Sequence, residues 1–306
     1  MHWNLDVSMP LIRIIFVLGL LIFSATPELC SARRALLIGI GDYDTDRTGW
    51  RRIHGDDDVM LLSPLLKENG YTVNSLTNSY ATKKNIVAAI KKLANECRAG
   101  DHVYLHFSCH GQPVTDCNGD ESRKYDEAIA PYDALKSEGY ASGSGKYRGE
   151  NHLIDDEIAP LIDNISRKIG KTGILFVAFD ACYSRGLEKG DNDFPEDFDV
   201  DELPDFMRGT ADFFSPTDKT YLQSIKPPQK FSGASPIAIV SACRENERNF
   251  ELRVGNRHYG SLSYCIYKLL LKNADLQKWI NYFKSGSYKT SGCFLKIQHP
   301  TITLYQ

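Results

Sequence analysis

Gly173 to Gly186 reads GILFVAFDACYSRG, a continuous apolar run followed by an acid, a cysteine and a polar turn. A short apolar run bounded by glycine and polar residues is typical of a buried strand. Asp180 and Cys182 would then stand at the carboxyl end of that strand, where open parallel sheets collect their reactive groups. The sequence therefore predicts a thiol presented at the rim of a sheet.

Strand-like and helix-like segments alternate on both sides of this stretch. Apolar runs predict strands at residues 35–41, 71–76, 101–109, 174–179 and 237–241, and helical spacing of apolar residues predicts helices at 56–69, 82–97, 155–165, 259–271 and 276–283, before a short apolar tail at 294–304. Such alternation indicates parallel strands joined by helical crossovers on both faces of the sheet. The expected fold class is α/β.

The N-terminal residues 1–32 have a different composition from the rest. Arg13 precedes an apolar run at 14–23, and small residues follow up to Ala32. This order predicts a secretory signal peptide and hence a secreted or periplasmic protein with no stable membrane span after signal removal. A retained anchor is the alternative, although the run is shorter than the roughly 20 residues that span a bilayer. Cys30 leaves a lipoprotein as a further alternative.

Residues 33–306 are expected to form one domain. An insertion near 187–235, rich in acids and prolines and without periodicity, is expected to be exposed. The formal net charge of −3 gives no field that favours nucleic acid, so no nucleic-acid partner is expected. Export would allow some cysteines to pair, but the sequence does not say which.

A base for the cysteine is found at the end of an earlier strand. His110 follows the predicted strand 101–109 and would meet Cys182 at the same sheet edge. A thiol needs an adjacent base to become an effective nucleophile at neutral pH. Gly111 allows a backbone N–H to approach the oxyanion that forms on attack. A buried cysteine and a turn histidine are the structural alternative.

The two neighbourhoods HFSCHG (106–111) and FVAFDACYSRG (176–186) resemble those of the caspase-like cysteine peptidases of family C14, most closely the metacaspase branch. The resemblance runs from residue 35 to about 300 and includes IHGDDDV, DEAIAPYDA, NHLIDDEI, IVSAC and QHP. It implies a caspase-like three-layer sandwich with a mostly parallel six-stranded sheet. It also implies a cysteine endopeptidase in which Cys182 is the nucleophile, His110 the base, and the backbone N–H groups of Gly111 and Cys182 the oxyanion hole.

The resemblance also implies a first specificity pocket lined by Asp58, Ser108 and Asp180. Two carboxylates in a partly buried pocket would bind the side chain of Arg or Lys. We therefore expect cleavage after Arg or Lys, and not after Asp. For Asp58 the alternative is a favourable interaction with the helix dipole at the start of its helix.

Asp133, Asp155 and Asp156 match family positions that bind an activating calcium ion, and carboxylate oxygens suit that ion. Lys189 stands where the family has a fourth acid, which speaks against the site, and helix-start carboxylates are the alternative. Otherwise no cofactor is expected to be required. Basic residues in the insertion are candidate self-cleavage sites: Arg208, Lys219, Lys226 and Lys230.

Two rival functions remain open on the sequence. One is a legumain-like asparaginyl hydrolase or ligase of the same fold, against which Asp180 argues. The other is a catalytically silent caspase-fold binding module, which the presence of both His110 and Cys182 disfavours. The expected partners are protein or peptide substrates with Arg or Lys before the cleaved bond, and the chain is expected to be a monomer. His106 is expected to pack or hydrogen-bond, and His54 and His152 to lie in loops.

Overall fold

The computed structural model describes residues 31–306 apart from Arg123, 142–145, 183–205, Ala211, Pro228 and Asn246. The predicted signal peptide falls almost entirely outside the described residues, as does the first part of the predicted insertion. In the part of the chain that is described, no helix has both the length and the hydropathy needed to cross a membrane.

A six-stranded sheet forms the centre of the fold, with strand order β11-β8-β7-β3-β1-β2. The strands are β1 (Arg33–Gly39), β2 (Tyr71–Thr77), β3 (His102–Ser108), β7 (Ile174–Asp180), β8 (Ile237–Ser241) and β11 (Thr301–Tyr305). All neighbours pair in parallel except β11, which runs antiparallel to β8. The expected mostly parallel, six-stranded caspase-like sheet is confirmed.

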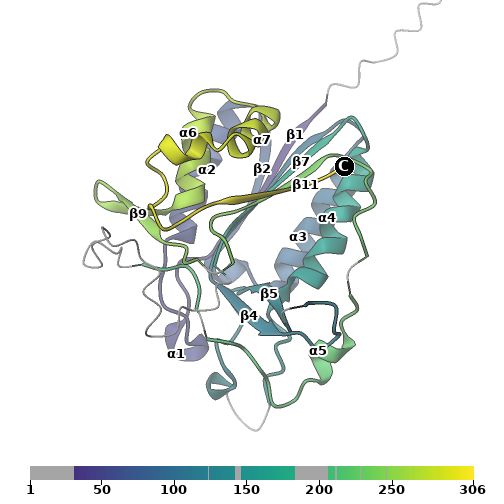
Figure 1. Cartoon of the computed structure of the whole chain (residues 1–306), viewed down its shortest axis with the longest axis vertical. Coiled ribbons are helices and arrows are strands. Elements are labelled where there is room, and N and C mark those ends of the chain that lie inside the picture. The colour runs from purple at the N-terminus through teal and green to yellow at the C-terminus, as the bar shows by residue number, and fades with distance from the viewer. Residues whose placement is uncertain are drawn as a thin grey trace, which may run out of the picture. The chain divides into compact units, whose positions relative to one another are not determined.

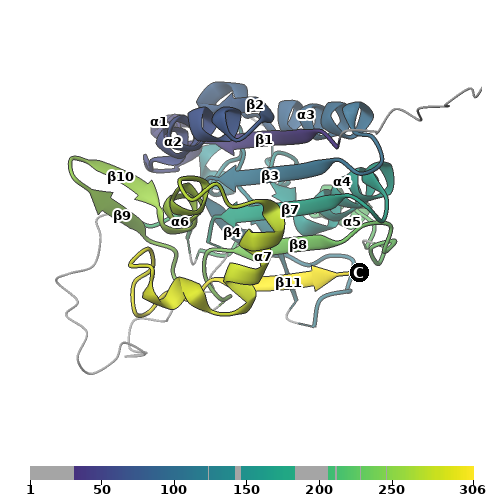
Figure 2. The ribbon, with the colours of Figure 1, turned by 90° about the horizontal axis from the view of Figure 1, so that it is seen from above.

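Helices cover both faces of this sheet (Figures 1 and 2). One face carries α2 (Gly55–Glu68), α6 (Ser261–Leu270) and α7 (Leu276–Lys284), and the other carries α3 (Lys83–Glu96) and α4 (Asp155–Ile169). Two short helices, α1 (Thr45–Thr48) and α5 (Thr220–Ser224), lie in the connections. The three layers match the sequence expectation, and the predicted helix ends agree with the observed ones to within a few residues.

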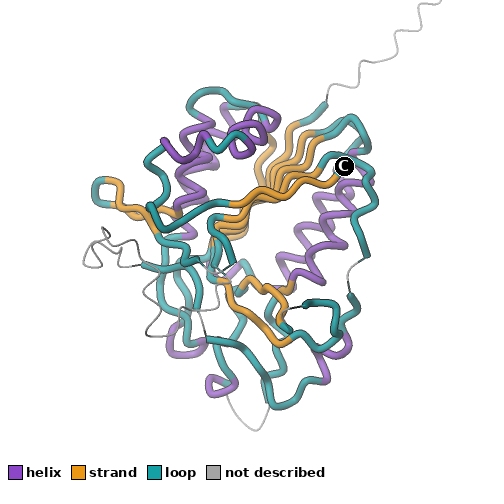
Figure 3. Tube along the Cα trace, viewed as in Figure 1, coloured by secondary structure: helices purple, strands orange, loops and turns teal. Residues whose placement is uncertain are grey.

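Two small sheets were not predicted from the sequence. The strands β4 (Gly111–Thr115), β5 (Tyr125–Ile129) and β6 (Leu153–Ile154) form an antiparallel sheet, and β9 (Glu251–Val254) pairs with β10 (Arg257–Gly260) as a hairpin. In Figure 3 the first lies below the main sheet and the second projects at its side. Both lie toward the end of the main sheet where β3 and β7 finish, and they supply walls for the site.

Alternation along β3 and β7 decides which side chains reach this site. Val103, Leu105 and Phe107 join the apolar core under α3 and α4, whereas Tyr104 joins the core under α2, α6 and α7. Successive side chains in a strand point to opposite faces. The even-numbered Ser108 and, on β7, Asp180 therefore point toward α2 and α6. These two residues are also direct partners in the register of β3 and β7.

Candidate active site

His110 follows β3 and is held in one orientation by its surroundings. Its Nε2 lies 2.8 Å from the carbonyl oxygen of Arg51, to which it donates, and its ring stacks on Trp50 with centroids 4.9 Å apart. The Tyr43 ring lies on it at 5.1 Å. Burial lowers the pKa of His110 to about 4, so the imidazole is neutral at pH 7. With Nε2 donating to Arg51, the other ring nitrogen, Nδ1, is the atom that can accept a proton.

Cys182 lies two residues beyond the end of β7 and is fully buried. Its Sγ lies 3.4 Å from the carbonyl oxygen of Glu247. A second thiol, that of Cys243, lies beside it, and the hydrogen bond between the two thiols is the largest cause of the strongly raised pKa of Cys243. Among the described residues, the cysteines from Cys97 to Cys293 form no disulfide.

The three predicted pocket residues come together beneath the start of α2. Asp58 is fully buried and accepts hydrogen bonds from the Ser108 hydroxyl at 2.7 Å and from the backbone N–H of Gly260 at 3.0 Å. Helix α2 can pack this close because a Cβ at Gly55 would lie 2.2 Å from the carbonyl oxygen of Ser108. Asp180 is fully buried too, and its Oδ2 accepts from the Ser263 hydroxyl at 2.6 Å.

The chain's own Arg208 occupies this pocket. Its Nη2 lies 2.7 Å from Asp58 Oδ2, and its Nη1 lies 3.7 Å from Asp180 Oδ2 and donates to the Ser108 hydroxyl. The Arg208 side chain is completely buried. The expectation that the whole insertion near 187–235 is exposed is therefore wrong at Arg208, because the two buried carboxylates hold that side chain inside.

A third carboxylate, which the sequence did not single out, completes the pocket. Glu251, the first residue of β9, places Oε1 at 2.9 Å from Arg208 Nη2 and 3.0 Å from Arg208 Nε. Its other oxygen, Oε2, lies 2.5 Å from His54 Nδ1. Three buried carboxylates thus surround one guanidinium group, and the pocket has a charge that suits a cationic side chain.

The carboxylates of this pocket differ in how readily they hold a proton. Burial raises the pKa of Asp58 to about 7, against the opposing effect of Arg208. The pKa of Glu251 is lowered to about 2 although burial opposes this, because Arg208 and His54 both favour the carboxylate. The pKa of Arg208 rises above its usual value, since the three acids outweigh the burial of the guanidinium.

The backbone around Arg208 pairs with residues 249–251, at the start of β9. The Arg208 N–H donates to the Asn249 carbonyl at 2.9 Å, and Phe206 accepts from the Glu251 N–H at 3.1 Å. Met207 and Phe250 form the antiparallel bridge between these two bonds. Residues 206–208 therefore run as an extra strand along 249–251, which is how an extended peptide binds the edge of a sheet.

Gly209, the next residue, lies against Cys182. It forms a bridge with Cys182, and a Cβ on Gly209 would lie 2.2 Å from the Cys182 carbonyl oxygen and 2.9 Å from both the Cys182 Cβ and the Gly111 carbonyl oxygen. The Thr210 N–H then donates to Gly111 at 3.2 Å. Gly209 thus lies between Cys182 and Gly111, the two residues predicted to form the oxyanion hole.

The acids predicted to bind calcium are only partly brought together. Asp126, Asp155 and Asp156 each present an oxygen within 4.8 Å of the others, whereas Asp133 is not part of this group. Asp133 instead accepts from the Lys83 N–H at 2.9 Å, at the start of α3. The turn after β5 directs Asp133 away, so Asp126 on β5 takes the position that the sequence analysis gave to Asp133.

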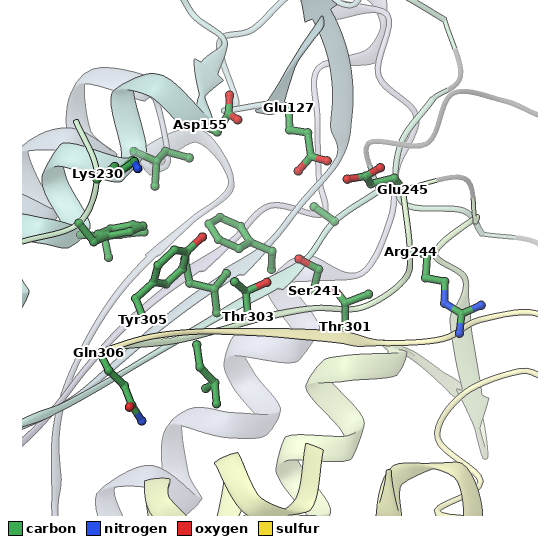
Figure 4. Close-up of a pocket in the computed structure, with 18 of the residues that line it drawn as sticks. Glu127, Asp155, Lys230, Ser241, Arg244, Glu245, Thr301, Thr303, Tyr305 and Gln306 are labelled. Atoms are coloured by element: carbon green, nitrogen blue, oxygen red, sulfur yellow. The ribbon is translucent and has the colours of Figure 1, made fainter. Parts of the chain in front are cut away.

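A pocket of about 1270 Å³ lies on the α4 side of the same strand ends. Figure 4 shows it between Thr303 and Tyr305 of β11 and, opposite them, Asp155 and Glu127. Its lining includes Cys243 but neither His110 nor Cys182.

The remaining histidines have structural partners. His106 is buried between the Tyr104 hydroxyl at 2.7 Å and the Ser263 hydroxyl at 3.1 Å, as its packing role predicts. His152 is also buried, with its Nε2 2.8 Å from Gln112 Oε1. His54 precedes α2 and contacts Glu251, which makes it part of the pocket wall rather than a simple loop residue.

Comparisons with known proteins show the family of this chain. Metacaspase-1A of Aspergillus niger is 24% identical over 89% of this chain and 72% of its own length, and Metacaspase-1 of Schizosaccharomyces pombe is 25% identical over 80% and 61%. Metacaspase-1B of Aspergillus fumigatus is 32% identical, but the match spans 50% of this chain and about a third of that protein, 35%.

The solved structure of protein GSU0716 from Geobacter sulfurreducens superposes with a TM-score of 0.61 at 18% identity, covering 90% of this chain and 93% of that one, which shows a shared fold. Residues 33–188 match the family described as "Metacaspase, peptidase C14 domain". The chain therefore belongs to the metacaspase family of C14 cysteine-type endopeptidases.

Proposed function

We propose that this protein is an endopeptidase that cleaves after Arg or Lys, with Cys182 as nucleophile and His110 as base. The observation that carries the specificity is Arg208, which is buried against Asp58, Asp180 and Glu251 while the following peptide bond lies at Cys182. The Arg208 guanidinium lies where the side chain of the substrate residue before the cleaved bond would bind.

The proposed chemistry gives each of these groups one role. Nδ1 of His110 takes the proton of the thiol, and the sulfur attacks the carbonyl carbon of the basic residue. The oxyanion lies near the N–H groups of Gly111 and Cys182, a type of contact worth roughly 3–4 kcal/mol in other enzymes. His110 then gives its proton to the leaving nitrogen, the C–N bond breaks, and water hydrolyses the thioester.

The first substrate is the chain itself. We propose cleavage of the Arg208–Gly209 bond, because Arg208 pairs with Asp58, Asp180 and Glu251 while Gly209 forms a bridge with Cys182. The other candidate residues, Lys219, Lys226 and Lys230, are at least partly exposed, and it is Arg208 that pairs with Asp58, Asp180 and Glu251. They are therefore poorer candidates for the first cut.

We also propose that Asp126, Asp155 and Asp156 hold an activating calcium ion. One oxygen each of Asp126 and Asp155 is buried and has no hydrogen-bond partner among the described residues. Burial and the neighbouring carboxylates raise the pKa of both side chains to about 8. A divalent cation would compensate these buried charges, and oxygen ligands suit calcium.

The test is a set of fluorogenic peptides that differ only in the residue before the cleaved bond, with Arg, Lys, Gln, Asn or Asp at that position. We expect hydrolysis after Arg and Lys only, and none by Cys182→Ala. Cleavage after Asn would support the asparaginyl alternative and overturn the pocket argument. Absence of hydrolysis, together with no labelling of Cys182 by a thiol-reactive Arg peptide, would support the silent binding module.

A further inference from the structure

Phe206 lies in a small site of its own, next to the pocket that holds Arg208. Its ring contacts His54 edge-on with centroids 4.7 Å apart, and His258 with centroids 4.9 Å apart. The two imidazole rings are themselves 5.0 Å apart. The three rings thus form a closed group, in which two histidines from distant parts of the chain hold one phenyl ring.

The backbone explains why this ring and the guanidinium enter side by side. Residues 206–208 are extended along 249–251, and residues two apart in a strand face the same side. Phe206 and Arg208 therefore both point at the wall made by the start of α2 and by the β9–β10 hairpin. Met207 points the other way, so this wall does not recognise it.

Glu251 links the two sites. Its Oε1 contacts Arg208, while the same carboxylate accepts from the His54 backbone N–H at 2.8 Å and lies 2.5 Å from His54 Nδ1. His54 is therefore held in place by the residue that binds the basic side chain. His258 comes from β10, opposite Arg253 in the hairpin register.

We propose that His54 and His258 form a second specificity site, which selects an aromatic residue two positions before the basic residue of the substrate. The preferred substrates are peptides of the form aromatic-X-Arg, with Phe206-Met207-Arg208 as the built-in example. This inference rests on the proposed function, because it takes the 206–208 segment as a bound substrate. An aromatic ring between two imidazole rings gains edge-to-face and stacking contacts that an aliphatic side chain does not.

The experiment compares two peptides, acetyl-Phe-Met-Arg and acetyl-Ala-Met-Arg, each joined to aminomethylcoumarin. The full-length chain carries Phe206→Ala and Arg208→Gln, so that its own segment does not fill either site. We expect kcat/KM to be about tenfold higher for the Phe peptide. In the added His258→Ala variant this ratio should fall to near one. His258→Phe should keep the preference, and Arg257→Ala, a change at an exposed neighbour, should not alter it.

Each outcome is informative. Equal rates for the two peptides, or a preference that His258→Ala leaves intact, would overturn the second site while the cleavage after Arg stands. Failure to cleave either Arg peptide, with cleavage of an Asn or Asp peptide, would overturn the proposed function and this inference with it. A Phe preference that is lost in His258→Ala and kept in His258→Phe would support the site.

Discussion

Replacing Arg208 by Gln tests whether the pocket selects a positively charged side chain. The change keeps a long polar side chain but removes the cation that faces Asp58, Asp180 and Glu251, all of which are buried. Removing one partner of a buried ion pair is worth about 3–5 kcal/mol, which corresponds to roughly a hundred- to several-thousand-fold. Water can hydrate the three carboxylates once residues 206–208 leave the pocket. We therefore expect the lost free energy to weaken the binding of residues 206–208 in the pocket, and in this way to slow self-cleavage.

The assay follows self-cleavage of the purified full-length chain by intact mass. The wild type should be cut between Arg208 and Gly209, and Arg208→Gln should be cut there at least about a hundredfold more slowly. Self-cleavage of Arg208→Lys should be slowed only about tenfold, because lysine keeps the positive charge but lacks the planar guanidinium that binds carboxylates through two N–H groups. Lys226→Gln, a change at an exposed basic residue of the same insertion, should cleave like the wild type. A cut after residue 208 at the wild-type rate in Arg208→Gln would refute the reasoning.

A second variant separates the fit of the backbone from the charge. Gly209 has a φ of +137°, in the region that other residues avoid, and a Cβ there would approach the Cys182 carbonyl oxygen to 2.2 Å. Gly209→Ala should therefore slow self-cleavage although Arg208 is unchanged. If Gly209→Ala is cut as fast as the wild type, the Arg208–Gly209 bond is not the one that lies at the sulfur.

Three further predictions concern the pocket and the acidic group. Because burial places the pKa of Asp58 at about 7 and that of His110 at about 4, the rate of self-cleavage should fall in two steps as the pH is lowered. The step near 7 comes from the loss of a carboxylate partner of the substrate cation, the step near 4 from protonation of the base, and Asp58→Asn should abolish only the first. Calcium should raise the thermal midpoint of the wild type and of Asp133→Asn by several degrees relative to EDTA, but not that of Asp126→Asn, as scanning fluorimetry would show. Glu251→Gln should raise KM for Arg peptides about tenfold with a smaller change in kcat, and an unchanged KM would contradict a role of this carboxylate in the pocket.

The sheet and its reactive edge were predictable because their signals are local. The apolar run that ends at Asp180 is a strand whichever neighbours it has, and an equivalent run ends at Ser108. Once both strands are placed in one parallel sheet, their last residues must meet at one edge. The register confirms this, since Ser108 pairs directly with Asp180. The meeting of Asp58 with these residues depended on the resemblance, because three aspartates stand together at the start of α2.

The parts that sequence reasoning missed depend on contacts between distant segments that have no periodic pattern. Glu251 and Arg208 are 43 residues apart, and neither lies in a segment with an amphipathic pattern. Arg208 was noticed only as a basic residue in an acidic insertion. The sequence pointed to Asp133 rather than Asp126 for the acidic group with Asp155 and Asp156 for a similar reason. Asp126 lies on β5 and Asp133 in the turn that follows it, and only the path of this turn decides which of the two lies near Asp155.

Cleavage alone does not empty the pocket. After the Arg208–Gly209 bond is cut, Arg208 keeps its ion pairs and the strand bonds of residues 206–208 with 249–251, and only the contacts of Gly209 and Thr210 with Gly111 and Cys182 are free to separate. The new end remains covalently joined to Cys182 through the preceding chain, so it competes with added substrate as an intramolecular ligand. The new carboxylate on Arg208 adds a negative charge near Asp58, Asp180 and Glu251, which weakens the binding of the cleaved end in the pocket. Activity toward added peptides should therefore develop after a lag, and it should depend on how well a substrate displaces a tethered product.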